Sequence, residues 1–215
     1  VGVQHQGLSP VRPPPKARPI GLVSGGRAPV PAAFAQRFGE ALAAAGAEIV
    51  ALARVKAMFP GRALDASEVA DWLNRIEYDV PLVAYFGGAE ASEWARKTIR
   101  QADLVVFACR GQAPAPDLTQ LESFACGVHP APARRLVRVH DIRQNEVSGT
   151  AAWLARLPCF MHHHVALEDQ IDIDSLVRFL CGRAVGFVAG GGGSLGTAHV
   201  GVYKAFRERG AMFDI

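Results

Sequence analysis

Short apolar runs alternate with amphipathic segments along most of this 215-residue chain. The runs are as short as strands that are buried on both faces of a sheet, and they lie at Ile20–Val23, Glu48–Ala51, Leu82–Phe86, Leu104–Ala108, Leu136–His140 and Val185–Ala189. The segments between them have helical spacing and lie at Pro31–Ala45, Ser67–Ile76, Ser92–Gln101, Leu118–Cys126, Gly149–Arg156 and Asp174–Cys181. Ser67, Ser92 and Asp174 are the expected N-caps of three helices. The alternation predicts an α/β fold in which a doubly wound, mostly parallel sheet carries helices on both faces.

The same pattern divides the chain into three parts. Residues 1–17 are polar and rich in proline, which is typical of an extended linker that enters a domain from something upstream. Residues 18–182 form the predicted α/β domain, with five strands by residue 145 and an edge strand within Pro158–Leu167. Residues 183–215 are expected to begin a second domain with a strand, a glycine loop and a helix. The junction is therefore placed near Gly182–Arg183.

Composition narrows the class of protein. Half of the residues are apolar and the net charge is only +3, so charge gives no case for nucleic-acid binding. The four cysteines form no CxxC pair, which favours free thiols in a reducing, cytoplasmic compartment over disulfides or a zinc site. No apolar run reaches the length of about 18 residues that a membrane span needs. A denser basic stretch, Arg134 to Arg143, is interpreted as a solvated face around a strand.

The carboxyl ends of the predicted strands carry the first candidate site, because ligands of open α/β sheets bind at that edge. The candidate crevice is formed by Ser24–Arg27, Gly87–Gly88 and Arg110–Gly111, with the polar residues His140, Asp141 and Glu146 nearby. The glycine pair after the first strand could cradle a phosphate. A tight turn is the preferred interpretation, because GxGxxG is not satisfied and prolines follow.

Three consecutive histidines, His162–His164, suggest a metal site at first sight. Neighbouring side chains of a strand point to opposite faces, so only His162 and His164 share one. Two ligands without a nearby carboxylate or cysteine make a poor zinc site, and a structural role is preferred. No metal and no cofactor are therefore expected. The tryptophans are expected to anchor the core.

The most informative segment is the glycine run Gly190–Gly196, which follows a predicted strand and precedes a helix. Consecutive glycines leave backbone N–H groups uncovered, and such groups bind a phosphate or stabilise a negative oxygen that forms during a reaction. Two interpretations stay open on the residues alone. Gly191, Gly193 and Gly196 fit the dinucleotide fingerprint GxGxxG, with Asp214 near the place of a ribose-binding acid. The alternative is an oxyanion loop for acyl transfer.

The residues around this run resemble the opening of the patatin-like phospholipase domain. The motif is GGGG-x-x-G-x-x-H-x-G-V over Gly190–Val202, followed by Lys204-Ala205-Phe206 and a glycine before a short segment. Upstream, Ser148–Thr150, His162–Val165 and the stretch from Arg178 to Gly186 narrow the resemblance to bacterial relatives of neuropathy target esterase. It covers Pro19–Ile215. The resemblance implies cyclic-nucleotide-binding-like domains upstream, then this intermediate region, then the patatin domain.

The resemblance also implies roles for the loop. The oxyanion of a tetrahedral intermediate would be bound by backbone N–H groups of Gly190, Gly191, Gly192, Gly193 and Gly196. The serine nucleophile of a GxSxG elbow and its aspartate base would lie beyond Ile215, so no catalytic residue is expected in this chain. Ser194 formally fits GxSxG but lacks a positioned base, and a loop role is preferred. Leu195 replaces the basic residue that the family normally has, which bears on the activity of the parent protein.

Three functions are considered. The first is a fragment of a serine lipid hydrolase that cleaves acyl esters of lysophospholipids or similar lipids, inactive by itself and in peripheral contact with the inner face of a membrane. The second is a regulatory or interaction module that relays a signal from upstream domains, and the third is a nucleotide-binding α/β domain. In each case, Val185–Ile215 is expected to pack against the α/β domain or to self-associate, because the apolar helix face must be covered.

Overall fold

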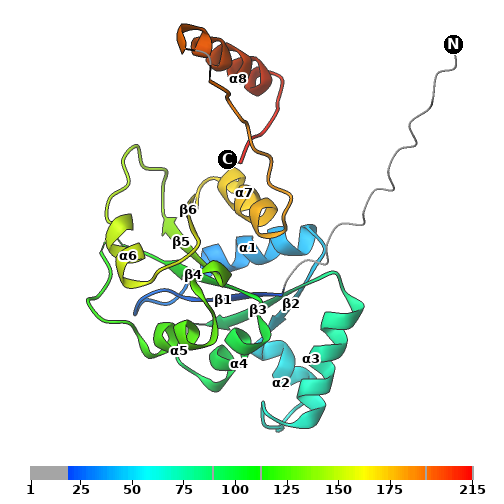
Figure 1. The fold of residues 1–215 in the computed structure, drawn as a ribbon. Helices are drawn as coiled ribbons and strands as arrows, with labels where there is room; N and C mark the ends of the chain where they lie inside the picture. Colours follow the sequence, from blue (N-terminus) through cyan, green and yellow to red (C-terminus); the bar gives the residue numbers. More distant parts are fainter. Residues whose placement is uncertain (1–18, 89, 112, 192, 215) are drawn as a thin grey trace, which may run out of the picture.

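The computed structural model describes residues 19–88, 90–111, 113–191 and 193–214. A six-stranded sheet with the order β2-β3-β1-β4-β5-β6 forms its centre (Figure 1). The strands are β1 (Ile20–Ser24), β2 (Ala47–Ala51), β3 (Leu82–Gly88), β4 (Leu104–Cys109), β5 (Arg134–His140) and β6 (Met161–Ala166). Every neighbouring pair is parallel. The predicted doubly wound α/β fold is confirmed, and the edge strand within Pro158–Leu167 is present as β6.

Helices cover both faces of the sheet (Figure 1). One face packs against α1 (Ala32–Ala44) and α7 (Gln170–Leu180). The other packs against α2 (Leu52–Met58), α3 (Ser67–Asp79), α4 (Glu93–Gln101), α5 (Gln120–Val128) and α6 (Thr150–Arg156), with a 3₁₀ turn at Ala131–Ala133 before β5. The β1-to-β2 connection runs one way along the sheet and the later connections run the other way. Right-handed crossovers therefore place α1 on one face and α3 to α6 on the opposite face.

The apolar side chains that the pattern predicted to be buried form the core. Phe34 and Phe38 of α1 stack with ring centroids 5.3 Å apart, and both are fully buried under the sheet. On the opposite face Trp153 of α6 and Trp94 of α4 are 2% exposed, whereas Trp72 is half-buried against Phe59. Two of the three tryptophans are thus core anchors as predicted, and the third covers the edge of an apolar layer.

Of the three predicted helix caps, one is confirmed and two are wrong. The Ser92 hydroxyl caps α4 as predicted, by accepting a hydrogen bond from Ala95 N–H at 3.1 Å. The cap of α7 is Asp169 and not Asp174, because α7 begins earlier than the apolar pattern indicated. Ser67 is the first residue of α3 rather than its cap. The short helix α2 was not predicted, since seven residues show too little periodicity to be recognised.

The segment after Gly182 is built differently from the rest. The predicted strand at Val185–Ala189 does not form, which corrects the expectation of a strand, loop and helix. A strand needs a neighbour to satisfy its backbone groups, and the bond from Asp214 N–H to Val185 C=O (2.8 Å) is a single contact. A 3₁₀ turn (Gly193–Thr197) leads into the predicted helix, α8 (Ala198–Glu208). In Figure 1, α8 lies beyond α7, away from the sheet.

Two further sequence predictions meet the structure at the surface. No helix in the described part of the chain is long and apolar enough to cross a membrane. The basic stretch is not a solvated face throughout, because Arg134 is 7% exposed and Arg138 only 1% exposed. The proposed linker, residues 1–17, lies outside the described residues, and so does Gly192.

Candidate functional site

The described glycines of the loop Gly190–Gly196 have open space on their Cβ side. A Cβ atom added at Gly190, Gly191, Gly193 or Gly196 would meet no atom within 4 Å. Gly193 has φ +56°, in the left-handed region that favours glycine. Neighbouring atoms therefore do not explain why side chains are absent at these four positions.

The loop leads into the N-terminus of α8, which runs for 11 residues. The first N–H groups of a helix have no partner within it, and they create a positive potential that favours an anion. No acidic side chain lies in the first turn of α8 to compete for that position.

Asp214, the candidate ribose-binding acid, is already engaged. Its side chain is 1% exposed and accepts three bonds from the Arg178 guanidinium of α7, at 2.6, 3.0 and 3.1 Å. It also accepts a bond from Val185 N–H at 3.0 Å. The bonds from Arg178 lower the pKa of Asp214 to about 2, so the carboxylate is ionised at neutral pH. This contact, which we call the Arg178–Asp214 clasp, ties both ends of the segment 185–214 to α7.

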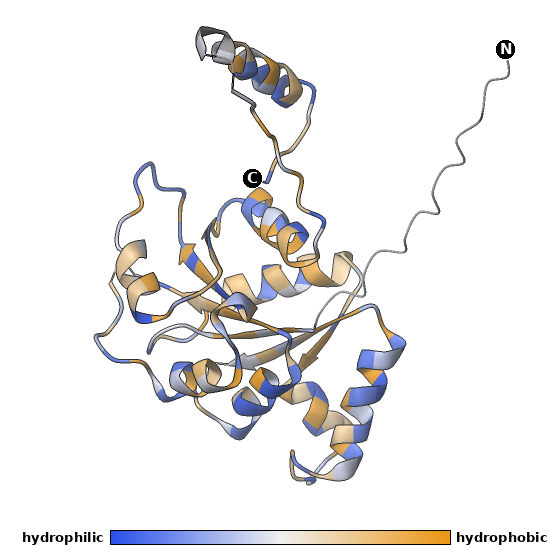
Figure 2. Cartoon of the chain, in the orientation of Figure 1, coloured by the Kyte–Doolittle hydropathy of each residue, from blue (hydrophilic) through white to orange (hydrophobic). Residues whose placement is uncertain are grey.

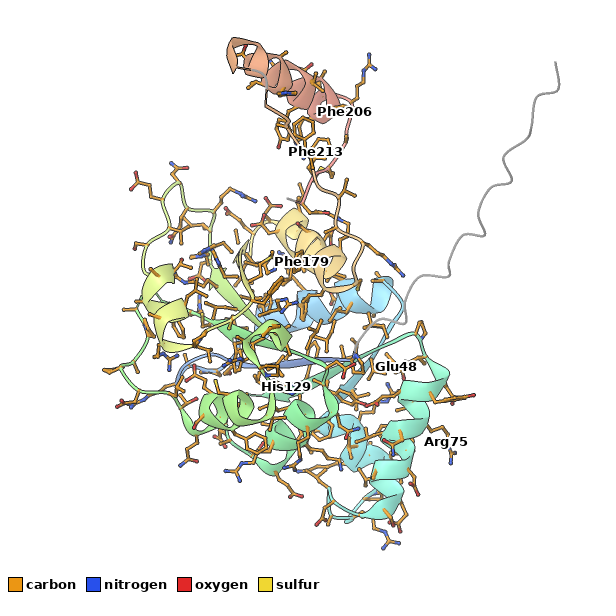
Figure 3. All side chains as sticks on the ribbon, viewed as in Figure 1. Glu48, Arg75, His129, Phe179, Phe206 and Phe213 are labelled. Carbon is orange, nitrogen blue, oxygen red and sulfur yellow. The ribbon has the colours of Figure 1, made fainter. Side chains whose placement is uncertain are left out.

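Aromatic rings hold the segment together around this clasp. Phe213 lies within 5.2 to 5.9 Å of the rings of Phe187, Tyr203 and Phe206, measured between centroids. Figure 3 shows Phe206 on α8 and Phe213 on the returning chain. A cavity of about 410 Å³ lies between α8 and the edge of the α/β domain, with Arg178, Asp214 and Tyr203 in its wall.

Apolar side chains of α8 are exposed. Val200 is 69% exposed and Phe206 49% exposed, and Figure 2 shows hydrophobic and hydrophilic positions mixed along this helix. The Arg178–Asp214 clasp joins the segment to the α/β domain, but no residue of α8 is buried, so the predicted covering of its apolar face by the α/β domain is not seen. Self-association of the segment stays a prediction.

The second candidate site, at the carboxyl end of β1, is filled by the protein itself. Gly25 and Gly26 are buried. The N–H of Gly26 donates to the Glu122 carboxylate of α5 at 2.8 Å, and Glu122 is 0% exposed. Arg156 of α6 donates to both oxygens of this carboxylate, at 2.6 and 2.7 Å. Burial alone would raise the pKa of Glu122, but the bonds from Arg156, Thr119 and Gly26 outweigh it and lower the pKa.

Other side chains near the predicted crevice also make contacts within the protein. Arg138 of β5 donates to the carbonyls of Ser148 and Gly111 and to the Thr150 hydroxyl, which fixes the loops after β4 and before α6. Arg110, which belongs to the predicted crevice, is paired with Asp141. Burial raises the pKa of the Cys109 thiol, at the end of β4, to about 12, so this thiol is not a nucleophile at neutral pH.

The three histidines divide between two faces, as predicted. His164 stacks on His140 of β5, with ring centroids 5.3 Å apart and a 3.0 Å contact between ring nitrogens. His163 points the other way and packs against Phe179 of α7 at 4.6 Å. Burial, with smaller contributions from neighbouring positive charges, lowers the pKa of His163 and of His164 to about 4. No group of three or more metal-binding side chains is found among the described residues.

Comparison with known proteins identifies the family of the α/β domain. Residues 22–180, which make up most of the chain, match the model of the Neuropathy Target Esterase family P-loop like domain. The chain belongs to the neuropathy target esterase family. The patatin-like, neuropathy-target-esterase-like resemblance is therefore confirmed, whereas the bacterial subgroup stays a prediction.

Curated relatives of this neuropathy target esterase domain are named patatin-like phospholipase domain-containing proteins or lysophospholipases. A patatin-like phospholipase domain-containing protein of Caenorhabditis elegans is 28% identical over 187 residues, which cover 67% of this chain and 14% of the relative. Lysophospholipase NTE1 of Mycosarcoma maydis is 28% identical over 201 residues, 69% of this chain and 11% of the relative. Patatin-like phospholipase domain-containing protein 7 of Rattus norvegicus is 27% identical over 213 residues, 85% of this chain and 16% of the relative.

The chain thus spans between 11% and 16% of the length of these three relatives. No solved structure matches it significantly.

Sequence reasoning missed the residues that fill the P-loop-like turn of this family domain. Glu122 was not singled out, although Thr119-Gln-Leu-Glu122 has the S/T-x-x-E spacing of a capping box. The box is present, with Glu122 N–H donating to the Thr119 hydroxyl and Thr119 N–H donating to Glu122. Recognising it would have predicted the helix start, but the long-range contact with Gly26 is visible only in the fold.

Proposed function

We propose that residues 183–214 contribute the oxyanion loop of a patatin-like serine lipid hydrolase that cleaves acyl esters of lysophospholipids or similar lipids. The donors are the backbone N–H groups of Gly190, Gly191, Gly192, Gly193 and Gly196. The nucleophilic serine and its aspartate base are supplied by residues that are not among these 215. The protein acts in the cytoplasm, in peripheral contact with the inner face of a membrane.

One observation carries this proposal. The four described glycines of the loop are exposed or half-buried, and an added Cβ at each of them meets nothing within 4 Å. Glycine at such positions leaves room for a bound group to approach the backbone closely. The N-terminus of α8 adds donors that favour the negative oxygen of a tetrahedral intermediate. The names of the relatives, among them a lysophospholipase, supply the substrate class.

An assay of the 215-residue chain alone tests whether the nucleophile lies outside it. We expect hydrolysis of p-nitrophenyl butyrate at the rate of buffer, both for the chain and for Ser194→Ala. Turnover that Ser194→Ala abolishes would contradict the loop role, because Ser194 would then be the nucleophile.

A longer form that includes the nucleophile tests the loop directly. We expect Gly193→Ala to lower kcat about a hundredfold with little change in KM, because a side chain at φ +56° strains the turn and misaligns N–H groups that act mainly in the transition state. Gly201→Ala, within α8, is the matched control, because its Cβ also meets nothing within 4 Å and it lies outside the loop. Equal loss in both variants would argue against an oxyanion role.

The Arg178–Asp214 clasp favours a second candidate function, that of a coupling module. It joins the last turns of α7, inside the P-loop-like domain, to both ends of the segment that carries the glycine loop. A displacement of α7 by an upstream cyclic-nucleotide-binding-like domain would thereby reach the loop.

Amide hydrogen exchange tests the coupling. We expect Arg178→Met to speed exchange at the amides of Val185 and Asp214, while the amides of β1 and β4 keep their protection. Arg183→Met, at an exposed position that follows α7, is the control. Unchanged exchange at Val185 and Asp214 would show that the clasp does not hold the segment.

A further inference from the structure

The turn after β1 has the position of a phosphate-binding loop, between the first strand and the first helix of a parallel sheet. A working P-loop presents a series of free backbone N–H groups and a lysine to its phosphates. In this turn, Gly25 N–H donates to Ala108 C=O at 2.8 Å and Val30 N–H donates to the Ser24 hydroxyl at 2.9 Å. Pro29 and Pro31 have no N–H group to offer.

A carboxylate lies where the turn would meet its ligand. Each oxygen of Glu122 accepts two bonds from different parts of the chain. Oε1 accepts from Gly26 N–H at 2.8 Å and from Arg156 at 2.6 Å, and Oε2 accepts from Thr119 N–H at 2.7 Å and from Arg156 at 2.7 Å. The Arg156 side chain is 7% exposed, and its guanidinium lies 5.0 Å from the ring of Trp153.

The two glycines of the turn are also packed closely against other side chains. A Cβ added at Gly26 would lie 2.9 Å from the Trp153 ring, and one added at Gly25 would lie 3.1 Å from Cys109 Cβ. Gly26 itself has φ +80°, so the glycine both permits the turn and admits the indole. Buried side chains therefore occupy the space on the Cβ side of both glycines.

We infer that the β1 turn is an anion-binding loop whose permanent ligand is the protein's own Glu122 carboxylate. Two backbone N–H groups and the two Arg156 donors form the site, and Arg156 supplies the positive charge that a P-loop takes from its lysine. The domain therefore keeps the architecture of a nucleotide-binding fold while its own side chain excludes the phosphate. Glu122 joins α5, α6 and the β1 turn in one buried contact.

Chemical rescue tests this inference in the 215-residue chain. Glu122→Ala removes a CH₂COO⁻ group, which has the composition of acetate less one hydrogen. We expect the variant to melt about ten degrees or more below the wild type, because Arg156 is left without its buried partner. Acetate at about 100 mM is expected to restore several degrees, by binding the folded state at the vacated site, when compared with chloride at equal ionic strength.

Matched controls separate this effect from general salt effects. Glu68→Ala also removes a glutamate from the first turn of a helix, but Glu68 is exposed, so acetate should not change its melting temperature. The double variant Glu122→Ala, Arg156→Met should lose the rescue. Wild-type protein should show no shift with ATP or inorganic phosphate at millimolar concentration. A folded Glu122→Ala variant that ignores acetate, or a wild-type shift of several degrees with phosphate or ATP, would overturn the inference.

A second variant covers the case in which Glu122→Ala does not fold. Glu122→Gln has the same shape without the charge, and its amide resonances can be compared with those of the wild type. We expect the amide protons of Gly26 and Thr119 to move upfield as their charged acceptor is lost, while the amide of Gly46 stays in place. An unchanged Gly26 resonance would show that the turn does not hold the carboxylate.

Discussion

The chain contains two glycine-rich turns that each lead into a helix, and they differ in what surrounds the glycines. In the turn after β1, added Cβ atoms at Gly25 and Gly26 would come within 3.1 and 2.9 Å of other side chains. In the loop before α8, added Cβ atoms at the described glycines would meet nothing within 4 Å. Packing within the folded domain therefore requires glycine in the first turn. Packing among the described residues does not require glycine in the second.

The same contrast holds for hydrogen bonding. In the first turn, backbone N–H groups donate hydrogen bonds to Ala108, Glu122 and Ser24, all within the P-loop-like domain. The second turn begins a helix whose first turn has no acidic side chain. A glycine-rich sequence thus does not by itself indicate a binding site, because the bonding partners of the backbone decide between a structural turn and an open one.

The largest expected effect comes from adding a side chain to the turn after β1. Gly26→Ala should lower the free energy of unfolding by about 3 kcal/mol or more, since it combines a strained φ of +80° with overlap against the buried Trp153. Gly46→Ala is the control, with φ +93° and no atom within 4 Å of the added Cβ, and should cost about 1 kcal/mol. Urea titration measures both, and equal losses would mean that packing against Trp153 adds nothing.

An intermediate effect is expected from acid, which should act first on β6. His163 has a pKa of about 4 in the folded protein, below the ordinary value for an unfolded chain. As the pH falls, this histidine is therefore protonated in the unfolded state at a higher pH than in the folded state. Stability that is full above about pH 6.5 is then lost as the pH falls toward 4. His163→Gln should reduce this loss by about 1 kcal/mol, as measured by urea titration at pH 7 and pH 5. An identical pH dependence in the variant would contradict this assignment.

The Arg178–Asp214 clasp should resist acid for longer than β6. Its carboxylate has a pKa near 2, depressed below the ordinary value, so its contribution is present above about pH 4 and is lost only as the pH falls toward 2. Acid should therefore weaken the edge of the α/β domain before it releases the C-terminal segment.

The smallest effect is expected in the second turn. Gly191→Ala should change the free energy of unfolding by less than about 0.5 kcal/mol, because the added methyl group meets no neighbour and Gly191 is not among the glycines with positive φ. Urea titration beside Gly26→Ala makes the comparison direct. A loss as large as that of Gly26→Ala would show that the loop is packed against something.

The sequence predicted the sheet well because its strands are short apolar runs. Such runs can be recognised without knowing which residues they contact. All six strands of the domain, including β6, agree with the predicted order of elements. It failed at Val185–Ala189, where the same apolar pattern is present but no neighbouring strand is paired with it. Strand formation depends on a partner, and a local pattern cannot say whether one is supplied.

The candidate sites were predicted less completely, for a related reason. Arg138 is charged and was assigned to a solvated face, yet it is buried because the loops around it supply three acceptors. Glu122 and Arg156 lie 34 positions apart, and the Gly26 turn that they complete lies 96 positions before Glu122. Such a site is made by tertiary contacts between charged residues of types that are usually exposed. No sequence motif therefore predicts these contacts.

The position of Trp153 has a practical consequence. Its indole ring packs against the Gly26 turn and lies beside the Arg156 guanidinium, so its fluorescence emission should respond to any change in that turn. The chain contains only two other tryptophans, Trp72 and Trp94. With both replaced by phenylalanine, the remaining signal would come from Trp153 alone. The domain would then carry a built-in optical probe of its closed turn, without an added dye.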